Sequence, residues 1–212
     1  AFYKKTAGGW TKSEPDLGEK NGHVDIQTVS KDGQKVAYAY STAEKLPRYY
    51  VADLEVSGND LQFSNETEWV VLNEKLHKKP KVRAEVIRWQ GYNDEEVTGI
   101  LYYPADYEEG KRYPLMLSIH GGPTGYDQDQ WSERWSTYPQ LICRRGAFVL
   151  KPNYHGSGNH GRAFMESIKK NYYTPELEDI IKGIDYLDER GLVDREKLGA
   201  MGWSNGAILT TM

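Results

Sequence analysis

The sequence has a single cysteine, Cys143, among its 212 residues. One thiol cannot form a disulfide within the chain, and it cannot supply the several thiolate ligands of a zinc cluster. Because Cys143 lies in an apolar stretch that is typical of a helix, we interpret it as a buried, unreactive side chain. We expect neither a metal nor a cofactor.

The sequence also lacks long apolar runs and an excess of charge of one sign. No stretch approaches the ~20 apolar residues that span a bilayer, so we expect no membrane partner. The formal net charge is −4, and basic residues such as Lys78 and Arg83 are interleaved with acidic ones, so we expect no nucleic acid partner. The chain begins at Ala1 rather than at a methionine, so we expect the natural protein to extend further; a cytoplasmic and a periplasmic location both stay open.

Hydrophobic residues make up 38% of the sequence and charged residues 27%, which is typical of a globular protein with a buried core. We expect two domains. In the first, residues 1–77, Asp32-Gly33 separates two runs of alternating apolar residues and predicts a tight hairpin, because glycine readily adopts positive φ. Further strands are expected at 49–56 and 68–72, with a turn at 57–60. Four antiparallel strands are the size of one β-propeller blade, and a lone β-meander is the alternative.

The second expected domain, residues 78–212, follows the proline-broken stretch His77–Pro80. A hairpin is predicted from strands at 82–89 and 97–103. Strands and helices then alternate, which predicts an α/β fold with a parallel sheet that helices cover on both faces. The expected strands lie at 115–119, 147–150 and 198–202, and the expected helices lie near 138–142, 164–168 and 177–187 and from 207 onward. Thr174 is the predicted N-cap of the longest helix, and Gly191 lies just past its end.

Gly202-Trp203-Ser204-Asn205-Gly206 lies between a predicted strand and a predicted helix. In this context, the G-x-S-x-G pattern is typical of a nucleophile elbow. The sharp turn strains the serine backbone, and only glycines two residues away on either side leave room for the close approach. We therefore predict Ser204 as a catalytic nucleophile; the alternative is a glycine-rich turn without chemistry.

His120-Gly121-Gly122-Pro123 follows an earlier predicted strand. Acyl transfer needs N–H donors directed at the oxygen that becomes negative, and backbone without side chains can approach that oxygen closely. We predict the N–H of Gly122 as the first donor of this oxyanion hole and the N–H of Asn205 as the second. His120 is interpreted as a hydrogen-bonding residue that shapes the loop, and a plain tight turn is the alternative.

Three segments together resemble the prolyl oligopeptidase family of serine peptidases, in particular bacterial members of its acylaminoacyl-peptidase and dipeptidyl-peptidase branches. The segments are 113–123, 152–158 and 191–206. The resemblance implies an α/β-hydrolase catalytic domain capped by a β-propeller that admits short peptides. Residues 1–77 would then form the last propeller blade, and residues 78–212 the N-terminal portion of the peptidase domain.

The sequence departs from the family pattern at some positions. His120 stands where a tyrosine is frequent, which favours an oxyanion hole built from backbone. His155 stands where arginine is usual, which leaves substrate anchoring at this position open. His160 is interpreted as a loop residue, and the replacement of a frequent glycine by Ala207 as a harmless packing change.

The serine triad is incomplete in this sequence. A triad needs a base and an acid, which follow the serine in α/β-hydrolases, and the eight residues after Ser204 contain neither. Upstream histidines show no evident acidic partner. We therefore expect the triad's Asp and His beyond these residues, an inactive 212-residue chain, and a full-length peptidase that forms an acyl-enzyme on Ser204. A carboxylesterase and a non-catalytic hydrolase-propeller binding protein are the alternatives, and a homo-oligomer is compatible with the sequence.

Overall fold

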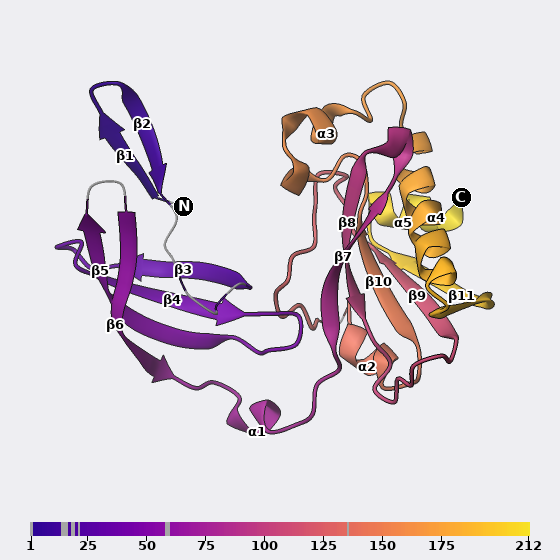
Figure 1. The fold of residues 1–212 in the computed structure, drawn as a ribbon, viewed down its shortest axis with the longest axis horizontal. Helices are drawn as coiled ribbons and strands as arrows, with labels where there is room; N and C mark the ends of the chain where they lie inside the picture. Colours follow the sequence, from indigo (N-terminus) through magenta and orange to yellow (C-terminus); the bar gives the residue numbers. More distant parts are fainter. Residues whose placement is uncertain (1, 14–16, 18–19, 21, 58–59, 135) are drawn as a thin grey trace. The chain divides into compact units, whose positions relative to one another are not determined.

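The computed structural model describes residues 2–13, 17, 20, 22–57, 60–134 and 136–212. The chain divides into two compact units, Ala1–Lys79 and Pro80–Met212. Each unit has its own β-sheet (Figure 1).

The first unit contains a four-stranded antiparallel sheet in the order β3-β4-β5-β6. The predicted hairpin is confirmed: Gly33, with φ of 73°, lies in the turn between β3 and β4, and its N–H donates to Ser30 O at 2.9 Å. The strands are β3 (His23–Val29), β4 (Lys35–Ser41), β5 (Arg48–Ser57) and β6 (Asp60–Val70).

The core of this sheet is aromatic. Tyr38 is fully buried, and its ring stacks on that of Tyr50 with centroids 5.4 Å apart. The strand predicted at 68–72 is only the end of the longer β6, because a polar stretch from Ser64 to Thr67 separates it from Leu61 and Phe63. Gly58 and Asn59, in the turn predicted at 57–60, lie outside the described residues. A two-stranded hairpin, β1 (Phe2–Thr6) with β2 (Gly9–Ser13), and the short helix α1 (Glu74–His77) were not predicted.

The second unit contains a five-stranded sheet in the order β11-β9-β10-β8-β7. The expectation of an α/β fold is confirmed, but the expectation of a parallel sheet is wrong. β9, β10 and β11 are parallel, whereas β8 pairs antiparallel with both β7 and β10, because the predicted hairpin joins this same sheet. The strands are β7 (Ala84–Gln90), β8 (Glu96–Tyr102), β9 (Tyr113–Ile119), β10 (Phe148–Asn153) and β11 (Val193–Gly202).

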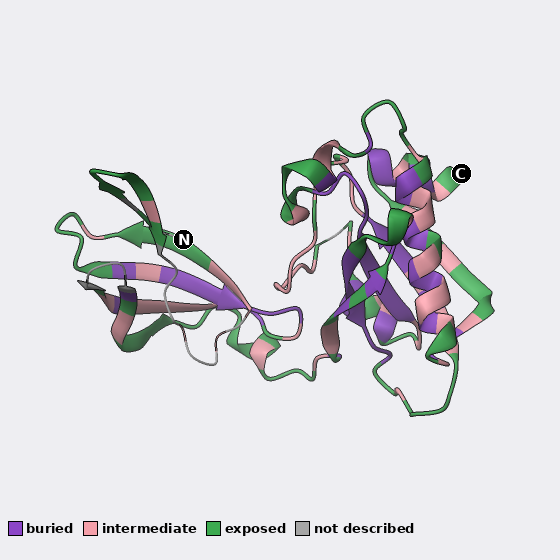
Figure 2. Cartoon of the chain, turned by 45° about the horizontal axis from the view of Figure 1, so that its top comes forward, coloured by how far each residue is buried: buried purple, intermediate pink, exposed green. Residues whose placement is uncertain are grey.

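The core of the second unit lies between one face of this sheet and two helices, α4 (Thr174–Glu189) and α5 (Asn205–Thr211). Leu101 and Phe148 from the strands are fully buried there, together with Leu187 of α4. In Figure 2, the purple, buried parts of this unit run along the strands of its sheet. On the other face, Ser132 contacts Tyr102 and Lys151. Because the carboxyl ends of parallel strands meet at one edge, the segments that follow β9, β10 and β11 lie close together.

The helix boundaries differ in detail from those predicted. The N-cap of α4 is Tyr173, which has positive φ, and not Thr174, because the side chain of Glu176 reaches back to accept the Tyr173 N–H at 2.6 Å. Gly191 follows the helix with φ of 71°, as predicted. The predicted helix near 138–142 is α2 (Pro139–Cys143), but Leu141 on its expected apolar face is half exposed.

Three further short helices connect the strands: η1 (Tyr92–Asp94), η2 (Gly158–His160) and α3 (Arg162–Glu166). Cys143 is fully buried as predicted, and burial raises the pKa of its thiol to about 12. None of the helices in the described parts of the chain combines the length and the apolar character that a bilayer-spanning segment needs.

Candidate active site

Ser204 lies in a sharp turn between β11 and α5. Its φ of 55° and ψ of −118° are unusual for a residue with a side chain, and such strain persists only where the surrounding structure enforces it. β11 ends at Gly202 and α5 begins at Asn205, so only two residues make the change of direction. The Ser204 side chain is exposed at this turn.

The glycines on either side of Ser204 allow close backbone contacts. A Cβ atom on Gly206 would lie 2.1 Å from Ile119 O and 2.6 Å from His120 O. A Cβ atom on Gly202 would lie 2.2 Å from Gly206 O. Real Cβ atoms do not approach backbone oxygen so closely, so neither site accepts another residue without movement of the chain. The predicted need for glycine two residues from the serine is therefore confirmed.

The loop that follows β9 lies directly against this turn. A Cβ atom on Gly121 would lie 2.6 Å from Trp203 O and 3.1 Å from Ser204 Cβ. The next residue, Gly122, has φ of 135°, which disfavours a side chain. The structure therefore brings together the two glycine-containing motifs, whose central residues are about eighty positions apart in the sequence.

The N–H groups of Gly122 and Asn205 are free to bind a ligand. Among the residues described, neither group donates a hydrogen bond within the protein. After Ser204, the first backbone N–H that donates a hydrogen bond within the elbow is that of Gly206, to Trp203 O at 2.9 Å. An N–H without a partner in the protein is the kind of donor that can bind a negative oxygen. Asn205 follows Ser204 directly, and Gly122 follows Gly121, which packs against Ser204.

His120 shapes the loop, as predicted, through both nitrogens of its ring. Nδ1 lies 3.0 Å from Gly121 O. Nε2 lies 3.0 Å from Ser157 Oγ. Burial lowers the pKa of His120, so the ring is held neutral. With both nitrogens engaged in the loop, His120 is poorly suited to accept a proton from Ser204.

Tyr154 connects this loop to the segment after β10, a contact that the sequence analysis missed. Its hydroxyl donates to His120 O at 2.6 Å, and its ring stacks on the His120 ring with centroids 4.4 Å apart. The buried Asn205 side chain reaches the same hydroxyl at 3.4 Å. Burial raises the pKa of Tyr154 to about 12, so its hydroxyl keeps its proton. Tyr154 was visible in the sequence only as part of a family motif.

The other two histidines near this edge behave differently from each other. His160, which was predicted as a loop residue, is the last residue of the short helix η2, and its Nε2 lies 2.9 Å from Thr98 Oγ1. The expectation that upstream histidines lack an acidic partner is wrong for His155: its Nδ1 lies 2.6 Å from Asp179 Oδ2, because α4 packs its buried face against the turn after β10. His155 is fully buried, so its side chain is not available as a surface anchor for a substrate.

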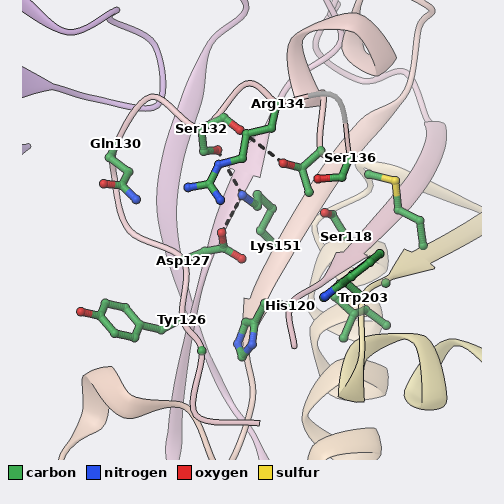
Figure 3. A pocket seen from close by; sticks show the side chains of 15 residues that line it. Ser118, His120, Tyr126, Asp127, Gln130, Ser132, Arg134, Ser136, Lys151 and Trp203 are labelled. Carbon is green, nitrogen blue, oxygen red and sulfur yellow. Dashed lines mark hydrogen bonds and ion pairs between the residues drawn. The ribbon is translucent and has the colours of Figure 1, made fainter. Parts of the chain in front are cut away.

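A cavity of about 270 Å³ opens beside the elbow, and His120 and Trp203 both contribute to its lining. On its wall the buried Lys151 lies between Asp127, whose carboxylate is 2.6 Å from Nζ, and Ser132, whose hydroxyl is 3.1 Å from it (Figure 3). Trp203 itself is 71% exposed. No group of three or more potential ligands in the described part of the chain could hold a metal ion.

Comparison with known sequences identifies related proteins. Residues 132–212 match the model of the prolyl oligopeptidase family. Dipeptidyl-peptidase 4 of Giardia intestinalis is 38% identical over 121 residues, which are 56% of this chain and 16% of that protein. A probable dipeptidyl-peptidase 5 of Emericella nidulans is 32% identical over 211 residues, and the match covers 90% of this chain and 29% of that protein. The chain thus spans less than a third of the length of these relatives.

The fold is also shared with a solved structure. Pyrococcus horikoshii acylaminoacyl peptidase matches with a TM-score of 0.70 at 22% identity, over 90% of this chain and 29% of that chain. At this level of identity, the likeness concerns the fold alone. The family model and the sequence relatives confirm the resemblance to the prolyl oligopeptidase family.

Proposed function

We propose that this chain carries the nucleophile and the oxyanion hole of a serine peptidase. Ser204 is the nucleophile, and the N–H groups of Gly122 and Asn205 are the two oxyanion donors. The single observation that carries the proposal is the strained, exposed serine at the end of β11, packed against the glycine loop that follows β9.

The proposed chemistry is acyl transfer from a peptide to Ser204. The hydroxyl oxygen attacks the carbonyl carbon of the scissile bond while a base removes the hydroxyl proton, and the carbonyl oxygen becomes negative. The unpaired N–H groups of Gly122 and Asn205 stabilise this oxygen, each by roughly 3 kcal/mol in the transition state. The amine then leaves, and water hydrolyses the acyl-enzyme.

The base and the acid of the triad are proposed to lie outside these 212 residues. Each histidine beside the elbow is already engaged: His120 within its own loop and His155 with Asp179. In hydrolases of this fold the acid and the histidine follow the serine in the chain. The greater length of the relatives is in keeping with this order.

We further propose that residues 78–212 are the N-terminal portion of an α/β-hydrolase domain and that residues 1–77 are the last blade of a β-propeller. The first assignment is supported by the mixed sheet with the serine turn at its edge, and the second by the four-stranded antiparallel sheet, which has the size of one blade. A propeller beside the catalytic domain would restrict access to short peptides. The proposed substrates are therefore short peptides, cleaved as by a dipeptidyl or acylaminoacyl peptidase.

The substrate class can be tested on the natural-length protein with three sets of chromogenic substrates. We expect aminoacyl or dipeptidyl amides to be hydrolysed with higher kcat/KM than p-nitrophenyl esters of simple acids, and the Ser204→Ala variant to hydrolyse none of them. N-acylated aminoacyl amides and unblocked dipeptidyl amides separate the acylaminoacyl from the dipeptidyl preference. Hydrolysis of esters without any hydrolysis of amides would favour a carboxylesterase, and hydrolysis of neither would favour a binding protein.

A further inference from the structure

His155 belongs to a buried cluster that lies behind the proposed site. The carboxylate of Asp179, on α4, is fully buried and accepts two hydrogen bonds from His155, one from the backbone N–H and one from Nδ1, both at 2.6 Å. Its other oxygen accepts the N–H of Tyr92 at 2.7 Å. One carboxylate therefore joins α4, the turn after β10 and the turn η1.

The surroundings of the second ring nitrogen of His155, Nε2, suit the protonated ring better than the neutral ring. Nε2 is buried and has no hydrogen-bond partner among the described residues, but it lies 3.5 Å from the carboxylate of Glu95, which is half exposed. With Nδ1–H directed at Asp179, a neutral ring leaves Nε2 as a buried acceptor without a donor. A protonated ring instead directs Nε2–H at Glu95. The charged form is therefore the one that both carboxylates favour.

The remaining groups around His155 do not reverse this preference. Phe164 stacks on the ring with centroids 4.1 Å apart, and Tyr92 meets it edge to face at 5.7 Å. His160 is the nearby cation when protonated, and burial lowers its pKa, so it stays neutral near pH 7. Burial raises the pKa of the Glu176 carboxyl on α4, which favours its neutral form, so the negative charge beside His155 comes from Asp179 and Glu95.

These surroundings set the pH range in which His155 is charged. Burial alone would lower the pKa of His155, but the hydrogen bond and the charge of Asp179, together with Glu95, outweigh burial and raise the pKa. A raised pKa means that the stabilisation is fully present below the unfolded value of about 6.5 and is lost as pH rises through the folded value.

The turn that His155 anchors supports the loop of the proposed oxyanion hole. Tyr154 donates to His120 O at 2.6 Å, and Ser157 Oγ lies 3.0 Å from His120 Nε2. Movement of this turn would therefore move the backbone that leads to Gly122.

We propose that His155 is a positioning residue which, as an imidazolium between Asp179 and Glu95, holds the 153–158 turn and through it the loop of residues 120–122. That His155 influences the reaction of Ser204 rests on the proposed function. That His155 stabilises the turn of residues 153–158 is independent of the proposed function. The turn is held most firmly when His155 is protonated and loosens as the proton is lost.

The experiment compares the natural-length protein with the variant Glu95→Gln, which removes a half-exposed charge and leaves the bond to Asp179 intact. The control is Glu96→Gln, an exposed neighbour whose carboxylate pairs with Arg88 at 2.7 Å. Hydrogen exchange of peptides covering residues 153–158 is measured by mass spectrometry at pH 6 and pH 9. The exchange rate in Glu95→Gln should exceed the wild-type rate roughly two- to fivefold at pH 6, as expected for a partly exposed ion pair, and should match it at pH 9.

The rate of labelling by a fluorophosphonate is measured on the same samples across this pH range. Relative to the wild type, Glu95→Gln should lose labelling rate at pH 6 and not at pH 9, whereas Glu96→Gln should follow the wild type. If the ratio of the Glu95→Gln exchange rate to the wild-type rate were the same at pH 6 and pH 9, the charge of His155 would not hold the turn. If this ratio changed with pH as expected but Glu95→Gln were labelled like the wild type at every pH, His155 would not position the loop of residues 120–122. A wild type that does not label at any pH would contradict the proposed function, while the exchange data would still decide the anchoring.

Discussion

The variant Gly206→Ala tests whether the elbow depends on close packing against the end of β9. The new Cβ atom would lie 2.1 Å from Ile119 O, and real Cβ contacts with backbone start at about 3.0 Å, so one backbone segment must move by about 0.9 Å. Either the elbow that carries Ser204 shifts, or the end of β9 that leads into the loop of Gly122 shifts. Both movements would displace a group of the proposed site.

The expected cost has two parts. Overpacking of a tight contact costs about 1–3 kcal/mol of the free energy of unfolding. A misplacement of about 1 Å between reacting groups lowers the rate roughly 100-fold. We therefore expect Gly206→Ala to unfold at lower urea concentration and to be labelled by a fluorophosphonate about two orders of magnitude more slowly than the wild type.

The matched control is Gly199→Ala, in β11, the strand that leads into the elbow. There the nearest atom to the new Cβ would be the terminal methyl of Met116, at 2.9 Å, and a flexible side chain can move away cheaply. This variant should keep nearly the wild-type labelling rate. The reasoning would be refuted if Gly206→Ala unfolded at the wild-type urea concentration and labelled at the wild-type rate.

Three further outcomes are expected. Gly122→Ala places a Cβ atom 2.3 Å from Thr124 N at a φ of 135°, so it should displace the proposed donor and lower kcat about 10²- to 10³-fold with a smaller change in KM; an unchanged kcat would argue against this donor. Tyr154→Phe leaves the carbonyl of His120 without its donor and should lower the free energy of unfolding by about 1–3 kcal/mol, measured by urea titration; no loss would mean that water replaces the hydroxyl. The Cys143 thiol, fully buried and with its pKa raised to about 12, should resist iodoacetamide at pH 8 until the protein is denatured, and rapid alkylation of the Cys143 peptide in the native protein would contradict its burial.

Local patterns predicted much of the structure. The hairpin at Gly33, the hairpin of β7 and β8, the end of α4 at Gly191 and the position of Ser204 between a strand and a helix all follow from signals within a few residues. Glycine is informative at these positions because positive φ or a close backbone approach is a local requirement that few other residues meet. The contact of the two glycine motifs could be expected because both follow strands of one parallel set.

Features that depend on contacts between distant parts of the sequence could not be predicted. Nothing near Tyr102 indicates that β8 pairs antiparallel with β10, which makes the sheet mixed. Likewise, no local pattern links His155 to Asp179, because the pair forms only when α4 packs behind the turn after β10. The first half of β6 was missed for a different reason: Leu61 and Phe63 alternate with polar residues, but the polar stretch from Ser64 to Thr67, in which Asn65 has a φ of 49°, breaks the alternation.

The central claim, that Ser204 is the activated nucleophile, is tested most directly by locating a fluorophosphonate adduct in the natural-length protein. The protein is labelled, digested and mapped by tandem mass spectrometry, with Ser204→Ala treated in parallel. We expect one adduct per chain, on Ser204, and no adduct in the variant. An adduct on a different residue, or equal labelling of Ser204→Ala, would contradict it.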